Sequence, residues 1–187
     1  MEDRAAVVDR VTLRPAVVGD VELILDLVND LAAAGEMLPR SPSTTVERLR
    51  DFVVAEVDGE FAGCGALALV WTDIAEVRSI AVRKEARGLG VGRRMAEFLL
   101  AEAKRLGVAR VMAFTYVTDF FLKLGFEVVD HDSLPHKVFQ DCLNCPKFNK
   151  CDEVAVAKDI LGHPGAPPLG PLSLPRPGRA LPRPPQA

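Results

Sequence analysis

The segment Arg87-Gly88-Leu89-Gly90-Val91-Gly92 constrains the fold of this chain more than any other feature. It lies between the apolar run Ile80-Ala81-Val82 and a stretch with helical periodicity. Its closely spaced glycines allow a sharp turn and let the backbone approach a ligand closely. The first amides of a helix have no acceptor within that helix and carry partial positive charge. The segment therefore predicts a strand-to-helix loop that binds the phosphate groups of a cofactor.

Two other glycine-rich loops fit this segment less well. A nucleotide-triphosphate loop ends in Gly-Lys-Ser or Gly-Lys-Thr, whereas Arg93 and Arg94 follow Gly92. A dinucleotide fingerprint needs different glycine spacing, early in a parallel βαβ unit, whereas the strands before this loop look antiparallel. A tight structural turn with no ligand is the remaining alternative.

The periodicity around the loop predicts a mixed α/β (α+β) fold, in which helices flank a mostly antiparallel sheet and the glycine loop opens the central helix. The dipeptide Asp58-Gly59 separates two β-type runs, which is a strong hairpin signal. Ser43 or Thr44 is expected to cap a short helix that runs through Arg50. We expect strands over residues 11–14, 52–57, 60–71, 75–82, 110–116, 126–130 and 154–157, and helices over residues 17–34, 44–50, 90–106 and 118–123.

Length and composition indicate one globular domain over residues 1–161, with a cysteine-bearing insert at 134–153. Residues 162–187 are half proline and glycine, so we expect a disordered tail. The formal net charge of −3 and the absence of a long basic run argue against nucleic acid as a partner. No apolar run approaches the ~18 residues of a membrane span, and no export signal precedes the domain. We expect a cytoplasmic protein with a small-molecule substrate, and we leave a homodimer open.

The pattern Arg87-x-x-Gly90-x-Gly92 resembles the pyrophosphate-binding motif of the GNAT acetyltransferase superfamily. The run Phe120-Phe121-Leu122-Lys123-Leu124-Gly125-Phe126 is similar to its second recurrent signature, and the predicted element order is also that of the superfamily. The resemblance implies acetyl-CoA as co-substrate, with its diphosphate held by Arg87 and by Gly88, Leu89, Gly90, Val91 and Gly92. It also implies that Ile80, Ala81 and Val82 pair with the pantetheine arm, because a strand separated from its neighbour offers backbone groups to the pantetheine amides.

Several strings resemble one group within that superfamily, the short single-domain N-acetylglutamate synthases. These strings include Leu38-Pro39-Arg40-Ser41, Glu76-Val77-Arg78-Ser79-Ile80-Ala81-Val82 and Leu134-Pro135-His136-Lys137. The resemblance implies transfer of an acetyl group to the α-amino group of L-glutamate, the first step towards arginine. The alternatives are acetylation of another small amine or a protein N-terminus, and a regulatory protein that binds acetyl-CoA or a metal without catalysis.

A dicarboxylate substrate needs cationic side chains, and arginine suits carboxylates best. Arg78 is the first candidate, and Arg40 and Lys137 are candidates for the second charge. The substrate ammonium must lose a proton before it attacks the thioester. Glu76 is the predicted base, because residues two apart on a strand face the same way. The alternative is that Glu76 only pairs with Arg78 or faces water.

The candidate proton donors to the departing CoA thiolate are Thr115 and Tyr116. The superfamily often has a tyrosine in the short helix that follows, but Phe120 and Phe121 stand there in this chain. The tyrosine that the superfamily often carries in that helix is therefore missing from these positions.

A cluster of metal-ligand residue types lies in the insert: His136, Cys142, Cys145 and Cys151. The two-residue spacing between Cys142 and Cys145 lets both thiolates face one ion, so a structural zinc ion is one prediction. Free thiols and a disulfide are the alternatives. Cys64, between two glycines in a strand, is expected to be a core residue.

Overall fold

The computed structural model describes residues 10–134, 147 and 150–161. Within these residues the strands form one seven-stranded sheet in the order β1-β2-β3-β4-β5-β7-β6. Neighbouring strands run antiparallel except β4 and β5, which are parallel. The strands are β1 (Val11–Pro15), β2 (Phe52–Val57), β3 (Glu60–Leu69), β4 (Ile74–Val82), β5 (Arg110–Thr115), β6 (Glu127–Val128) and β7 (Val154–Asp159).

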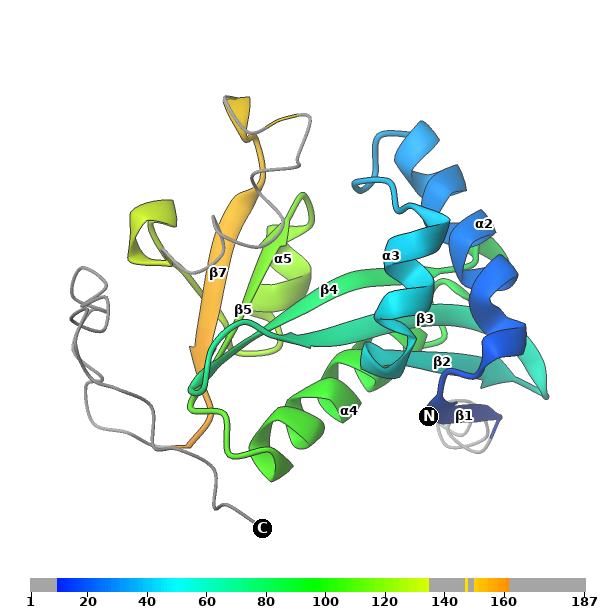
Figure 1. Cartoon of the computed structure of the whole chain (residues 1–187), viewed down its shortest axis with the longest axis horizontal. Coiled ribbons are helices and arrows are strands. Elements are labelled where there is room, and N and C mark those ends of the chain that lie inside the picture. The colour runs from blue at the N-terminus through cyan, green and yellow to red at the C-terminus, as the bar shows by residue number, and fades with distance from the viewer. Residues whose placement is uncertain (1–9, 135–146, 148–149, 162–187) are drawn as a thin grey trace, which may run out of the picture.

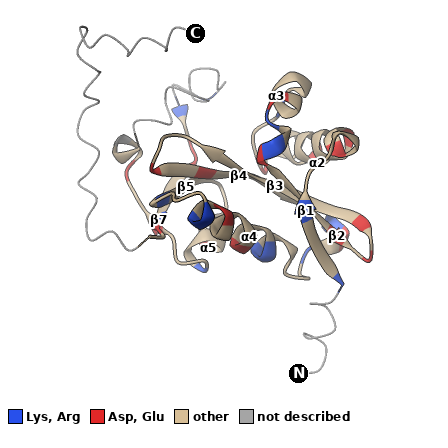
Figure 2. Cartoon of the chain, turned by 60° about the horizontal axis from the view of Figure 1, so that its bottom comes forward, with Lys and Arg blue, Asp and Glu red and all other residues tan. Residues whose placement is uncertain are grey.

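Helices cover both faces of the sheet. Helices α2 and α3 lie on one face and α4 and α5 on the other (Figure 2). The α-helices are α2 (Val21–Ala33), α3 (Pro42–Glu47), α4 (Val91–Arg105) and α5 (Thr118–Leu122), and the 3-10 turns are η1 (Val18–Asp20), η2 (Leu49–Asp51), η3 (Lys84–Ala86) and η4 (His131–Ser133). In the described part of the chain, no helix is both long enough and apolar enough to cross a membrane.

The core has a layer on each side of the sheet. On α4, Val91, Met95, Leu99 and Ala103 are fully buried. Their spacing of four residues places them on one helical face, which packs against the sheet. On the opposite face, Ile24 and Val28 of α2 pack with Phe52, Val54 and Cys64. Fully burying an aliphatic side chain of this size contributes about 1.5–3 kcal/mol, so these two layers hold α4 and α2 against opposite faces of the sheet.

The predicted fold class is confirmed, and local signals placed most elements within a few residues of their observed bounds. Asp58 and Gly59 have φ of 53° and 83°, as the tight hairpin turn between β2 and β3 requires. The predicted helix cap was wrong. Helix α3 begins at Pro42 and is capped by Ser41, whose Oγ accepts a hydrogen bond from the Thr44 amide at 3.2 Å. Proline is favoured at the first helical position, which explains the earlier start.

Several further element bounds differ from the predictions: β3 ends at Leu69, β6 spans only Glu127–Val128, and the first predicted helix divides into η1 and α2. The helix expected to continue through Arg50 divides into α3 and the 3-10 turn η2, and the last strand extends to Asp159. Strand β7 gains this length by pairing with β5 along its whole length. The tail at 162–187 and most of the insert at 134–153 lie outside the described residues.

Candidate functional site

Strands β4 and β5 separate beside a cleft. They pair in register only from Ile74 to Glu76 on β4, although β4 continues to Val82. Figure 1 shows the two strands diverging beyond this pairing. The cleft has a volume of about 1390 Å³. Its walls are the second half of β4, the end of β5 with α5, and the loop before α3 together with α3 itself.

A β-bulge changes the direction of β4 at the cleft. Cys64 of β3 pairs with Ala81 and Ala66 pairs with Arg78, so Ser79 and Ile80 together face Gly65. Ser79 has φ of 54°, which a residue other than glycine rarely adopts. A bulge of this kind bends its strand and increases the local twist. It therefore redirects β4 between the part that pairs with β5 and the part that leads to the glycine loop.

The glycine loop joins β4 to α4 at one end of the cleft. Gly88 and Gly90 have φ of 85° and 78°, which explains the need for glycine at both positions. Helix α4 begins immediately afterwards at Val91, so the amides of its first turn belong to this loop. Val82, Arg87 and Gly92 line the adjacent part of the cleft. This geometry suits an anion at the N-terminus of α4.

Arg87 makes an ion pair that the sequence did not predict. Its Nη2 lies 2.8 Å from Oε2 of Glu36, and both side chains are about half exposed. Glu36 belongs to the loop before α3. The pair therefore connects that loop to the glycine loop across the cleft.

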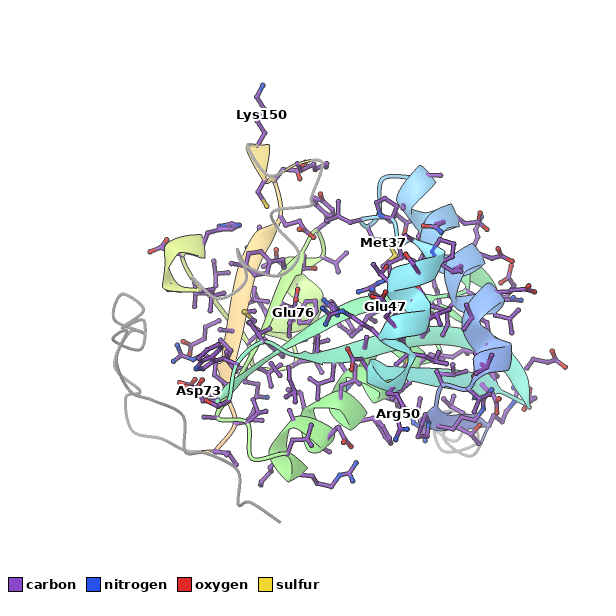
Figure 3. The ribbon with its side chains drawn as sticks, in the orientation of Figure 1. Met37, Glu47, Arg50, Asp73, Glu76 and Lys150 are labelled. Carbon is purple, nitrogen blue, oxygen red and sulfur yellow. The ribbon has the colours of Figure 1, made fainter. Side chains whose placement is uncertain are left out.

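Glu76 and Arg78 come together on β4 as their spacing predicts. Arg78 Nη1 lies 4.0 Å from Glu76 Oε2, and the two side chains are only 8% and 3% exposed. Both residues line the cleft. Figure 3 shows Glu76 on β4, with Met37 and Glu47 on the opposite wall. A carboxylate and a guanidinium thus lie where β4 and β5 separate.

Arg40 reaches the same part of the cleft from the loop before α3. Its Nε donates to Ser79 Oγ at 2.7 Å, and its guanidinium lies 5.3 Å from the centre of the Phe52 ring. Asn29 of α2 holds the Arg40 backbone: the Arg40 amide donates to Asn29 Oδ1 at 2.9 Å, and Asn29 Nδ2 donates to the Arg40 carbonyl at 3.2 Å. The loop position of Arg40 is therefore fixed at both its backbone and its side chain.

Thr115 and Tyr116 lie at the opposite wall, at the end of β5. Thr115 is buried, and its Oγ1 accepts a hydrogen bond from the Val117 amide at 2.9 Å. The Tyr116 hydroxyl donates to Asp152 Oδ1 at 2.7 Å and accepts from Lys147 Nζ at 2.9 Å. Burial raises the pKa of Tyr116.

The remaining candidate ligands can be placed only in part. Lys137, His136, Cys142 and Cys145 lie outside the described residues. Cys151 is exposed and borders the cleft. Among the described residues no group of three or more His, Cys, Asp or Glu side chains could hold a metal ion, so the zinc site stays a prediction. Burial raises the pKa of Cys64 to about 12, which suits a core thiol.

Sequence reasoning missed four residues that shape the cleft: Asn29, Arg48, Asp51 and Ser79. Asn29, Asp51 and Ser79 contact arginines that lie at least eleven residues away in the sequence, and Arg48 lines the cleft only because of how the fold places its turn. No local pattern distinguishes such residues from ordinary polar residues of a helix, a turn or a strand. Arg48 lines the cleft, and Asp51 lies behind its wall, 3.8 Å from Arg78.

Comparison with known proteins supports an acetyltransferase fold and chemistry. Residues 27–126 match the model of the acetyltransferase (GNAT) family. An uncharacterized N-acetyltransferase of Chlorobaculum tepidum is 36% identical over 148 residues, which cover 79% of this chain and 96% of that protein. An amino-acid acetyltransferase of Mycobacterium tuberculosis is 34% identical over 135 residues, which cover 71% of this chain and 77% of that protein.

Two solved structures with bound CoA share this architecture. The N-acetylglutamate synthase of Neisseria gonorrhoeae, complexed with coenzyme A and N-acetyl-glutamate, superposes with a TM-score of 0.72 at 26% identity. The match covers 80% of this chain and 35% of that longer chain. A Mycobacterium tuberculosis protein solved with CoA superposes with a TM-score of 0.70 at 28% identity, over 80% of this chain and 99% of that chain.

Proposed function

The chain belongs to the acetyltransferase (GNAT) family, and on that premise we propose that it transfers the acetyl group of acetyl-CoA to the α-amino group of L-glutamate. The observation that carries the proposal is the buried Glu76–Arg78 pair on β4, which faces the cleft where β4 and β5 separate. The names of two relatives, an amino-acid acetyltransferase and an N-acetylglutamate synthase, support the choice of acceptor.

The donor half of the proposed site is the glycine loop and the second half of β4. The amides of residues 88–92 would bind the diphosphate of acetyl-CoA, helped by the N-terminus of α4. Beyond Glu76, β4 has no register partner on β5, so the backbone of residues 80–82 can bind the pantetheine amides. Arg87 would contribute to phosphate binding by exchanging its partner Glu36 for the diphosphate.

The acceptor half is the part of the cleft between Arg78 of β4 and Arg40 of the loop before α3. Arg78 and Arg40 would bind the two carboxylates of glutamate, because a guanidinium can donate two parallel hydrogen bonds to a carboxylate. This arrangement would bring the α-ammonium near Glu76, which would accept its proton. The neutral amine then attacks the thioester carbonyl carbon, and the C–S bond breaks as the tetrahedral intermediate collapses. The nitrogen loses its second proton as the amide forms, and this proton balances the one that the departing thiolate takes up.

The departing thiolate takes up one proton. We propose Tyr116 rather than Thr115 as the source, because a phenol is a stronger acid than an alcohol and is still protonated at neutral pH. Tyr116 would first have to release the carboxylate of Asp152. Lys137 lies outside the described residues and stays a candidate for a further carboxylate contact.

The test is a steady-state screen of acetyl-CoA turnover against the free amino acids and N-terminal peptides. We expect the highest kcat/KM with L-glutamate. Arg78→Ala should raise the glutamate KM by roughly 10- to 100-fold, because a hydrogen bond to a charged group contributes about 1.5–3 kcal/mol. The control is Arg10→Ala, since Arg10 is an exposed arginine that pairs with Asp58 away from the cleft. Turnover with peptides alone, or with no amine, would contradict the proposal.

A further inference from the structure

Asp51 lies next to Arg78, one of the arginines that line the cleft. It is the last residue of η2 and precedes β2, and its side chain is 31% exposed. Its Oδ2 lies 3.8 Å from Nη2 of Arg78. Its backbone amide donates to the carbonyl of Arg48 at 3.0 Å, which closes the turn that carries Arg48. Asp51 therefore approaches Arg78 with its carboxylate and bonds Arg48 through its backbone amide.

A third arginine acts on the same carboxylate. The guanidinium of Arg40 lies over the ring of Phe52, the residue next to Asp51. Burial raises the pKa of Asp51, whereas the charges of Arg78, Arg48 and Arg40 lower it. All three arginines line the cleft. The positive charges of all three arginines therefore act on the Asp51 carboxylate.

Three guanidinium groups that face one cleft repel each other, and the repulsion grows as solvent is excluded. A carboxylate behind them offsets this repulsion without occupying the space that a substrate needs. Glu76 also faces Arg78, but Glu76 lies within the cleft at the point assigned to the substrate amine. Asp51 is the acidic partner that can stay in place while the acceptor is bound.

We propose that Asp51 is a positioning residue for the acceptor: its carboxylate holds Arg78, and with it the neighbouring Arg40 and Arg48, in the arrangement that binds the substrate carboxylates. The inference rests on the proposed function, because it names the group that sets acceptor specificity at the same site. It predicts that the affinity for the acceptor depends on a residue that does not itself touch the acceptor.

The test compares KM values for both substrates in variants at Asp51. Asp51→Asn should raise the glutamate KM roughly tenfold, the effect of losing one positioned charge, and change kcat and the acetyl-CoA KM less than about twofold. Asp51→Glu, which keeps the charge and moves it by one methylene, should give an intermediate glutamate KM. Asp51→Ser serves in place of Asp51→Asn if the latter does not fold. The matched control is Asp58→Asn, which removes an exposed carboxylate at the far end of β2.

A double-mutant cycle separates positioning from a general loss of structure. If Asp51 acts mainly through Arg78, adding Asp51→Asn to Arg78→Gln should raise the glutamate KM by much less than Asp51→Asn raises it in the wild type. Additive effects, or an equal rise in the acetyl-CoA KM, would show a merely structural role and overturn the inference.

The same assays distinguish failure of the inference from failure of the proposed function. Wild-type turnover of glutamate with an unchanged KM in Asp51→Asn overturns the inference alone. If the wild type prefers another amine that bears a carboxylate, the assignment of glutamate is wrong, and the KM comparison with that amine decides the inference. A preferred acceptor without a carboxylate, or no turnover, overturns both.

Discussion

Ser79 combines a strained backbone with a functional contact, and two substitutions separate these effects. Ala and Gly both remove the Oγ that accepts from Arg40 at 2.7 Å. That loss should cost about 1 kcal/mol at this half-buried position, less than a fully buried charged hydrogen bond. At a φ of 54°, a residue with a Cβ pays a further penalty of about 1–2 kcal/mol that glycine does not. Glycine loses about 0.5–1 kcal/mol more chain entropy on folding.

The balance predicts that Ser79→Gly is more stable than Ser79→Ala by about 0.5–1 kcal/mol. Urea denaturation at neutral pH measures the difference, and the melting temperatures should differ by about 1–4 °C for a domain of this size. The glutamate KM should rise about fivefold in both variants, because both release Arg40 equally. A Ser79→Ala variant as stable as Ser79→Gly would refute the strain argument, and unequal KM values would refute the role assigned to Oγ.

Three further variants test other contacts. Glu76→Gln should lower kcat by about 10²- to 10⁴-fold in steady-state assays, because the proposed base is lost. Gly63→Ala should lower the free energy of unfolding by about 1–3 kcal/mol in urea titrations, since the new Cβ would lie 2.5 Å from the Ala81 carbonyl oxygen. Asp20→Asn should cost about 2 kcal/mol, because Asp20 is buried and accepts hydrogen bonds from Arg14. Arg14 lowers the pKa of Asp20 in the folded protein. Urea titrations should therefore show the full difference in stability between the wild type and Asp20→Asn above about pH 4. The difference should shrink as the pH falls through the lowered pKa of the folded state.

Local signals in the sequence were sufficient for much of the fold. The hairpin turn at Asp58-Gly59 and the glycine loop depend on left-handed backbone positions that glycine and aspartate mark directly. The shared face of Glu76 and Arg78 follows from the period of a strand, and the structure places the two side chains 4.0 Å apart. These features need no knowledge of distant residues.

The shape of the cleft depends on contacts that no short segment encodes. The point where β4 leaves β5 is set by pairing between strands that α4 separates in the sequence. The bulge falls on Ser79, with no glycine to mark it. Arg87 engages Glu36, and Asp51 approaches Arg78, across separations that pattern reasoning does not bridge. Charged residues could be named from the sequence, but partners far away in the sequence could not.

The most direct test of the account is a crystal structure of the chain with CoA and glutamate. We predict the diphosphate on the amides of residues 88–92, the pantetheine arm along residues 80–82, and the glutamate amino group within hydrogen-bonding distance of Glu76 or one water away. Arg78 and Arg40 should contact the carboxylates. A diphosphate bound elsewhere, or a glutamate amino group on the far side of the cleft from Glu76, would contradict the account.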